Sequence, residues 1–323
     1  MFLKKIKDPI LFQGNLNKNN YFEGWYYKQI SKDESKILIL IPGISLFKND
    51  PHSFLQYLFV NRDIDGKFEM YNGYVRYPAQ DFKYKNNPFI INIGDNSFSK
   101  SEINLNLCND KININGNIKL HSFEEIKKSI LTPNIMGCFA YIPNMECYHG
   151  IMSMNHKIDG QLKINEHVVN FNDGKGYIEK DWGTSFPKEY IWVQCNSFEN
   201  ANTSLFLSIA HIPFMKKAFK GYICNLVLDH KEYRFATYNK SKIKIKKVNH
   251  KEIEVLIENN KAILRIETSI KEACDFIAPQ NGNMKGIVKE GILGNIKICL
   301  YDKRKHDTYL DESNLSSIEI MNF

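Results

Sequence analysis

The sequence predicts an all-β protein with two domains, and three observations support this expectation. The chain has 323 residues, and a domain commonly takes about 100–200. Its 17 tyrosines, 21 phenylalanines and 3 tryptophans are residue types that favour strands. Short runs of alternating apolar and polar residues recur with turn signals roughly every 8–12 residues, whereas the apolar spacing of helices is scarce. Many short strands of this kind indicate a barrel or a sandwich.

Strand signals are spread over the first half of the chain. Residues 36–41 form a short continuous apolar run, which is typical of a fully buried strand. Asp65-Gly66 between two apolar runs predicts a hairpin, as does Asp159-Gly160 further on. Asn115-Gly116 lies between alternating isoleucines and is the strongest hairpin signal. Further strands are expected at 21–30, 54–60, 68–77, 152–156, 161–164 and 167–179.

The second half repeats this pattern, with strands expected at 190–198, 204–211, 222–229 and 295–301. Alternating residues on both sides of Asn259-Asn260 predict another strand pair. Both halves open on a tryptophan-bearing strand, around Trp25 and around Trp192. We therefore expect two barrels, at residues 1–185 and 186–323.

Few helices are expected. At residues 122–130, Ser122 and Glu125 form a capping-box pattern and Pro133 ends the run, so a short helix is predicted there. Residues 1–20 are polar and rich in Asn and Lys, which predicts a loose arm.

Composition and charge indicate which kinds of partner the protein can bind and in which compartment it is expected. The net charge is +7, but the lysines are scattered, and at residues 241–251 they alternate with isoleucines like the wet face of a strand. Without a concentrated basic patch we expect no nucleic-acid binding, and at most a weak association with an anionic membrane surface. Seven cysteines without a Cys-x-x-Cys pair indicate reduced thiols and a cytoplasmic protein. Neither a signal peptide nor a transmembrane helix is apparent.

Three segments combine glycine with charged and aromatic residues, and they contain the candidate site. They are Tyr-Phe-Glu-Gly-Trp-Tyr-Tyr-Lys from Tyr21, Pro-Asn-Met-Glu-Cys-Tyr-His-Gly from Pro143, and Gly-Lys-Gly-Tyr-Ile-Glu-Lys-Asp-Trp-Gly-Thr-Ser-Phe-Pro from Gly174. In a regular strand Tyr177, Glu179 and Asp181 share one face. A phenol beside two crowded carboxylates is suited to proton transfer, because one carboxyl group can stay protonated. The alternative is a buried ion-pair cluster made by the charged residues of the first and third segments, which are Glu23, Lys28, Glu179, Lys180 and Asp181.

These three segments resemble the tocopherol cyclase family, and the long third segment is the most specific of them. The resemblance implies two packed lipocalin-like barrels and kinship with bacterial carotenoid hydratases and fungal pericyclases. The hydratases carry a Tyr-x-Asp pair that matches Tyr177 and Glu179 here, with Glu in place of Asp. The Lys, Asn and Ile content indicates an AT-rich bacterial source, so the family name does not assign tocopherol as the product.

We therefore expect acid-assisted cyclisation, hydration or isomerisation of a hydrophobic, isoprenoid-like small molecule. Glu179 is the expected proton donor, Tyr177 orients or relays, and Asp181 tunes the donor. Substrate contacts are expected from Glu23, Trp25, Tyr27, Glu146, His149, Trp182 and Trp192. No cofactor is expected, and the histidine and cysteine spacings match no common zinc pattern. The alternative is a lipocalin-like carrier that binds an apolar ligand without reaction.

Overall fold

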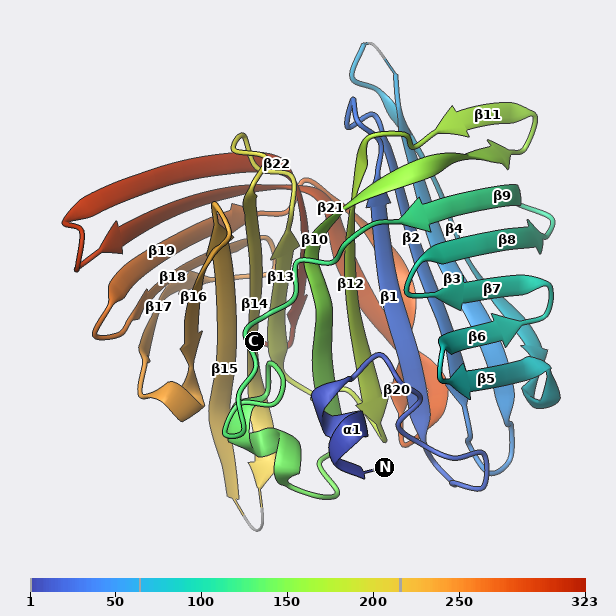
Figure 1. Cartoon of the computed structure of the whole chain (residues 1–323), viewed down its shortest axis with the longest axis horizontal. Helices are drawn as coiled ribbons and strands as arrows, with labels where there is room; N and C mark the ends of the chain where they lie inside the picture. The colour runs from blue at the N-terminus through green and yellow to red at the C-terminus, as the bar shows by residue number, and fades with distance from the viewer. Residues whose placement is uncertain (1, 64, 215–216) are drawn as a thin grey trace. The chain divides into compact units, whose positions relative to one another are not determined.

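The computed structural model describes residues 2–63, 65–214 and 217–323, and nearly all of their regular structure is β-strand (Figure 1). The one α-helix in these ranges is α1 (Phe2–Lys7). Three 3-10 turns accompany it, η1 (Ala79–Asp81), η2 (Gly137–Tyr141) and η3 (Thr237–Asn239). The expected all-β class with few short helices is confirmed. Within the described ranges, no helix has the length and apolar character needed to cross a membrane.

The chain divides into two compact units, and the main division falls between Phe186 and Pro187. Unit 1 holds residues 1–135, 140–186 and 277–286. Unit 2 holds residues 136–139, 187–276 and 287–323. The short segment 277–286 therefore joins unit 1 although most of its chain neighbours belong to unit 2. Its attachment is direct, because the side-chain amide of Gln56 bonds both the N–H and the C=O of Ile277.

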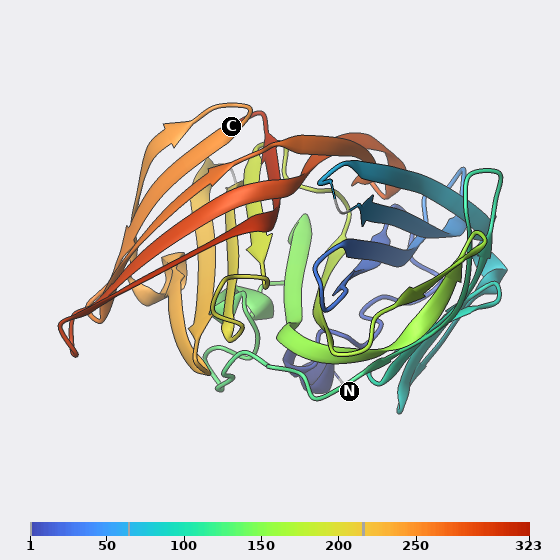
Figure 2. The same cartoon turned by 90° about the horizontal axis from the view of Figure 1, so that it is seen from above.

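Sheet A is twelve-stranded and curls into a nearly closed antiparallel barrel (Figure 2). Its order is β4-β3-β2-β1-β12-β10-β9-β8-β7-β6-β5, and β11 pairs with β10. The strands are β1 (Phe22–Ile30), β2 (Lys36–Ser45), β3 (His52–Arg62), β4 (Phe68–Pro78), β5 (Phe82–Asn86), β6 (Phe89–Ile93), β7 (Asn96–Ser99), β8 (Glu102–Cys108), β9 (Asn113–Leu120), β10 (Cys147–Ile164), β11 (His167–Asn170) and β12 (Gly174–Gly183).

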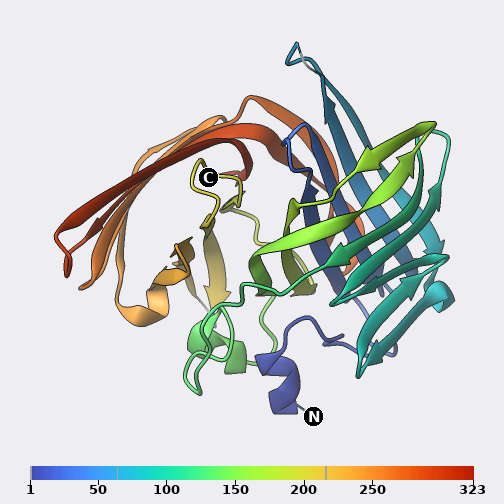
Figure 3. The same ribbon diagram turned by 45° about the horizontal axis from the view of Figure 1, so that its top comes forward.

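Sheet B is ten-stranded, antiparallel and strongly curved (Figure 3). Its order is β16-β15-β14-β13-β22-β21-β19-β18-β17, and β20 pairs with β21. The strands are β13 (Tyr190–Cys195), β14 (Thr203–Phe214), β15 (Lys217–Leu228), β16 (Lys231–Ala236), β17 (Lys242–Val248), β18 (Glu252–Glu258), β19 (Ala262–Ser269), β20 (Glu272–Gln280), β21 (Asn283–Asp302) and β22 (Asp307–Met321). Strand β17 exposes its lysines and half-buries its isoleucines, as the alternation predicts.

Aromatic and aliphatic side chains fill the interior of the sheet A barrel. Trp25, Tyr27 and Phe98 are fully buried there, and the Tyr27 and Phe98 rings lie 5.5 Å apart. Each large apolar side chain removed from water contributes about 1.5–3 kcal/mol, so this interior is a principal source of stability for unit 1.

Two of the predicted hairpin turns are wrong. Asn115-Gly116 lies inside β9, and Asp159-Gly160 lies inside β10. Both glycines have positive φ, 133° at Gly116 and 149° at Gly160, and each accommodates an irregular backbone within its strand. Strand β9 stays paired with β8 and β10 at Gly116, and β10 stays paired with β9 at Gly160. The Asp65-Gly66 turn between β3 and β4 is confirmed, with φ 79° at Gly66.

The predicted helix at residues 122–130 is also wrong, because this segment is extended and irregular. Its backbone bonds to β10 instead: the Glu124 N–H donates to the Asn155 carbonyl, and the Met154 N–H donates to the Glu124 carbonyl, both at 2.9 Å. Long-range backbone pairing thus overrides the capping signal. The arm at residues 1–20 is not loose either, since it begins with α1 and buries residues 9–12.

Candidate active site

The order of sheet A brings the three sequence segments together on neighbouring strands. Strand β12 lies between β1 and β10 although it comes last of the three in the chain. Trp25 of β1 lies opposite Lys180, and Tyr26 lies opposite Glu179. On the other side of β12, His149 of β10 lies opposite Asp181. Residues far apart in sequence therefore form one continuous patch three strands wide.

Alternation along β12 gives this patch two chemically different faces. Ile178 and Trp182 belong to the hydrophobic interior of the barrel, and Lys180 points to the same side. Tyr177, Glu179 and Asp181 occupy the opposite face. The expected sharing of one face by these three residues is thus what the strand geometry produces.

On that opposite face, His149 links the two carboxylates. Its Nδ1 lies 2.8 Å from Oδ1 of Asp181, and its Nε2 lies 3.6 Å from Oε2 of Glu179. The Tyr177 hydroxyl donates to the same Oε2 at 2.5 Å. The four side chains form a chain of contacts in the order Asp181, His149, Glu179, Tyr177, which we call the relay. Asp181 is 25% exposed, whereas Glu179 is 5% exposed, so the relay runs from the surface inward.

The electrostatics of the relay favour a proton on the imidazole. Burial alone would lower the pKa of His149, but the carboxylates of Asp181 and Glu179 outweigh it, and the pKa is raised above its ordinary value. Burial, reinforced by the Glu179 carboxylate, raises the pKa of Tyr177 well above its usual range, so the phenol stays protonated. The Cys147 thiol, 3.8 Å from Asp181, also has a raised pKa, from burial and then from Asp181. The relay therefore favours a proton on His149 and keeps the Tyr177 phenol protonated.

One metal-ligand set can be drawn from the described residues, and it is part of the relay. His149, Glu179 and Asp181 each offer one ligand atom, and these atoms lie within 4.8 Å of one another. Sequence spacing could not indicate this group, because its members come from two strands. An ion there would compete with the proton that the two carboxylates favour on His149.

The interior face carries a second polar cluster, centred on Glu23 and Lys180. Their side chains are fully buried and form an ion pair. The Lys180 ammonium also lies 4.5 Å from the Trp25 ring and 4.9 Å from the Trp182 ring. These contacts place Glu23, Trp25 and Trp182 on the barrel side of the sheet, away from Glu179. Tyr27 points to that side too.

The remaining expected site residues lie elsewhere. Glu146 is half-buried in the loop before β10, and its backbone carbonyl accepts hydrogen bonds from the N–H groups of Thr184 and Ser185. Trp192 lies on β13 in unit 2. Tyr26, which was not expected, meets the Tyr177 ring edge-on at 6.5 Å. The sequence could have indicated Tyr26, because it lies in the first segment and alternation places it with Lys28 on the strand face opposite Trp25.

Comparisons with known proteins identify the family of this chain. A family model described as tocopherol cyclase-like matches residues 123–321, more than half of the chain. A probable chloroplastic tocopherol cyclase of Oryza sativa subsp. japonica is 24% identical over 57% of this chain and 41% of its own length. A chloroplastic tocopherol cyclase of Zea mays is 30% identical over 23% of this chain and 16% of its own. The chain thus spans less than half the length of these curated relatives.

Solved structures share the fold at low sequence identity. CghA with Sch210972 superposes with a TM-score of 0.59 at 8% identity, covering 93% of this chain and 88% of that one. Kievitone hydratase from Nectria haematococca gives a TM-score of 0.53 at 9% identity with the same coverage. At this identity the likeness concerns the fold alone.

Proposed function

Because the chain belongs to the tocopherol cyclase-like family, we propose that it is an enzyme that protonates a carbon–carbon double bond of an apolar, isoprenoid-like molecule. The observation that supports this most directly is the relay, in which a buried Glu179 receives a hydrogen bond from Tyr177 and lies beside His149, whose pKa is raised by the two carboxylates against the effect of burial. Relatives named as cyclases and a fold neighbour named as a hydratase suit this chemistry, since ring closure and water addition can share a first protonation.

Each member of the relay has a distinct role in the proposal. Glu179 is the acid that faces the substrate, and His149 supplies its proton. Asp181 positions His149 through the 2.8 Å contact at Nδ1 and offsets its charge. Tyr177 holds the Glu179 carboxyl group in place through its 2.5 Å hydrogen bond. Tyr26 offers a ring face to positive charge beside Tyr177.

Cyclisation and isomerisation balance with the substrate alone, and hydration needs one water molecule in addition. Glu179 gives a proton to one alkene carbon, and a carbocation develops on the other. A substrate hydroxyl closes a ring onto that carbon, or a water molecule attacks it, and the released proton returns to the Glu179 carboxylate. Loss of a neighbouring C–H proton gives an isomer instead. Each course regenerates the relay.

We propose in addition that the protein is cytoplasmic, and that it takes its substrate from an anionic membrane surface. The net charge of +7 supports the second element.

The test is Glu179→Gln, which keeps the size and hydrogen-bonding capacity of the side chain but removes the acid. The assay follows a prenylated hydroquinone by liquid chromatography and mass spectrometry. Cyclisation and isomerisation shift retention at unchanged mass, and hydration adds the mass of one water. If Glu179 is the acid, turnover falls by about 100-fold or more, and the melting temperature stays near that of the wild type.

The matched control is Glu166→Gln, which removes an 88% exposed carboxylate just past β10. It is expected to leave both turnover and melting unchanged. A Glu179→Gln protein that is stable and fully active contradicts the acid role. One that melts early shows a structural ion pair instead. Retained binding of the hydroquinone with no conversion by either protein indicates a carrier.

A further inference from the structure

The N-terminal arm packs inside the sheet A barrel rather than on its surface. Ile10 and Phe12 are fully buried and Leu11 is 3% exposed, and all three belong to the same hydrophobic cluster as the barrel interior. The Phe12 ring lies 5.3 Å from that of Phe82 and 4.4 Å from that of Tyr84. The segment from residue 9 to residue 14, which we call the strap, therefore occupies space that a barrel of this type has for a ligand.

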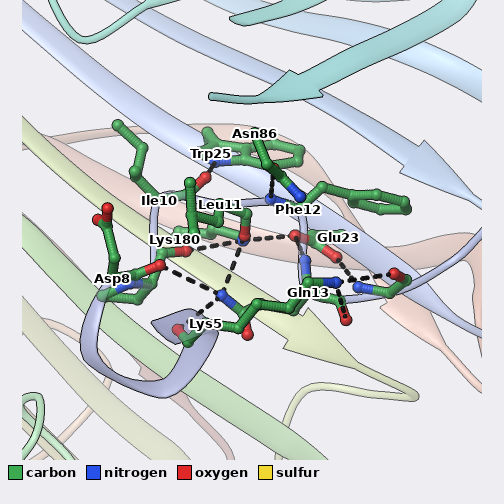
Figure 4. A network of polar contacts seen from close by, with 12 residues as sticks. Lys5, Asp8, Ile10, Leu11, Phe12, Gln13, Glu23, Trp25, Asn86 and Lys180 are labelled. Carbon is green, nitrogen blue, oxygen red and sulfur yellow. Dashed lines mark hydrogen bonds and ion pairs between the residues drawn. The ribbon is translucent and has the colours of Figure 1, made fainter. Parts of the chain in front are cut away.

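Side chains of the barrel interior donate hydrogen bonds to the backbone carbonyl groups of the strap, as Figure 4 shows. The Lys180 ammonium donates to the carbonyl oxygens of Pro9 and Leu11 at 2.8 and 2.6 Å. The Trp25 indole N–H donates to the Ile10 carbonyl at 2.7 Å. Three successive carbonyl groups thus each have a donor that comes from the barrel wall.

Side chains of the barrel also accept hydrogen bonds from the N–H groups of the strap. The Glu23 carboxylate accepts from the Gln13 N–H at 2.8 Å and from the Gly14 N–H at 3.0 Å. The Asn86 side-chain carbonyl accepts from the Phe12 N–H at 3.0 Å. Glu23 also pairs with Lys180. This one ion pair therefore binds both the N–H groups and the carbonyl groups of the same peptide segment.

Departure of the strap would leave the strand pairing of sheet A intact. Residues 9–14 have no strand assignment, and no strand of sheet A pairs with them, so their departure costs no ladder hydrogen bond. Residues 15–20, which connect the strap to the buried Tyr21 just before β1, are all exposed. The residues before the strap are tied by the partly exposed ion pair between Lys100 and Asp8, which is worth little, and by a buried hydrogen bond from the Asn134 amide to the Ile6 carbonyl at 2.9 Å.

We propose that the interior of the unit 1 barrel is a peptide-binding site, that the chain's own residues 9–14 are its resident ligand, and that this strap leaves and returns while sheet A stays folded. Its vacated donors and acceptors suit an apolar ligand bearing carbonyl and N–H or hydroxyl groups. The site lies on the face of β12 opposite the relay, so it is independent of the proposed reaction.

Hydrogen exchange of the intact protein, read by mass spectrometry, tests the opening. The Gln13 and Gly14 amides are expected to exchange at least about 10-fold faster than the amides of β12, because they need only a local opening. Lys180→Met is expected to speed strap exchange further. The matched variant Lys100→Met, which removes only the partly exposed tie to the strap, is expected to change it little. Strap amides that exchange no faster than those of β12 in the wild type overturn the proposal.

A second experiment tests whether an added peptide can replace the strap in the barrel. A protease site is placed within the exposed residues 15–19, and the folded protein is cut there. A fluorescent peptide with the sequence of residues 2–14 is then added in excess, and fluorescence anisotropy follows its uptake. Uptake that releases the cut strap supports the proposal, and Glu179→Gln should not alter it. A cut strap that stays bound until the barrel unfolds shows an integral part of the core and overturns it.

Discussion

Replacing Glu23 by Gln should strongly destabilise unit 1, and the size of the effect follows from its surroundings. The side chains of Glu23 and Lys180 are both fully buried and in contact. The variant leaves the Lys180 side chain with neutral partners only, the carbonyls of Pro9 and Leu11, and removes the carboxylate that opposes the lowering of the Lys180 pKa by burial. Breaking a buried pair by removing one partner costs about 3–5 kcal/mol.

Hydrogen bonds lost from the carboxylate contribute to that figure. Glu23 accepts from the N–H groups of Gln13 and Gly14 and from the Tyr21 hydroxyl, at 2.5 Å for the last. A hydrogen bond to a charged group is worth about 1.5–3 kcal/mol, against about 1 for a neutral one. A glutamine has one acceptor oxygen in place of two, so it cannot serve all three donors equally.

Urea unfolding, followed by tryptophan fluorescence, measures the change in unfolding free energy. The midpoint should fall with little change in slope, which marks a change in stability. The double variant Glu23→Gln with Lys180→Met should lose less than the sum of the two single variants, by about 0.5–3 kcal/mol. Glu166→Gln serves as the control and should stay within about 0.5 kcal/mol of the wild type. A Glu23→Gln protein that loses less than about 1 kcal/mol, with additive single variants, would refute this reasoning.

Three further predictions concern His156, the contact between Asp181 and His149, and Gly160. Burial lowers the pKa of His156 to about 3 from its ordinary 6.5, so the unfolded chain takes up a proton first as pH falls, and stability is lost from pH 6.5 downward by up to about 5 kcal/mol. A His156→Phe variant should show a flatter acid limb in urea titrations, and an unchanged limb would contradict this. Asp181→Asn should lower the pKa of His149, because burial then acts with less opposition, and an unshifted titration by NMR would contradict the contact. Gly160→Ala should cost about 1–3 kcal/mol, since φ is 149° and a Cβ would lie 2.3 Å from a carbonyl oxygen. Gly66→Ala is its control in open space, and equal losses would refute the clash.

The part of the site that follows from local alternation could be predicted from the sequence. Tyr177, Glu179 and Asp181 share a face because successive strand residues alternate, and no other information is needed. The strand pairing that brings His149 to Asp181 could not be predicted, since it depends on β12 lying between β1 and β10. For the same reason the sequence could not show that Glu23 and Glu179 lie on opposite faces of the sheet. Both were therefore candidates for one ion-pair cluster.

Local turn signals misled where strands continue across them. Asn115-Gly116 is a favourable hairpin pair in isolation, yet β9 is paired with both β8 and β10 through this point. The hairpin turn lies earlier, where the Asn109 side chain accepts from the N–H groups of Lys111 and Ile112. The arm was misjudged on its polar composition, because three apolar residues, Ile10, Leu11 and Phe12, decide where it packs.

The position of β12 also determines when the barrel can form during synthesis. Its partner residues on β1 precede it by 145 positions, for Ile30 and Lys175, to 161 positions, for Phe22 and Gly183. Until β12 has left the ribosome, one edge of β1 lacks its partner and Lys180 is not available to Glu23. Pairings of such long sequence separation form slowly, and an unpaired apolar strand edge promotes aggregation. Nascent chains that end before Gly174 should therefore depend on chaperones far more than chains that extend past Gly183.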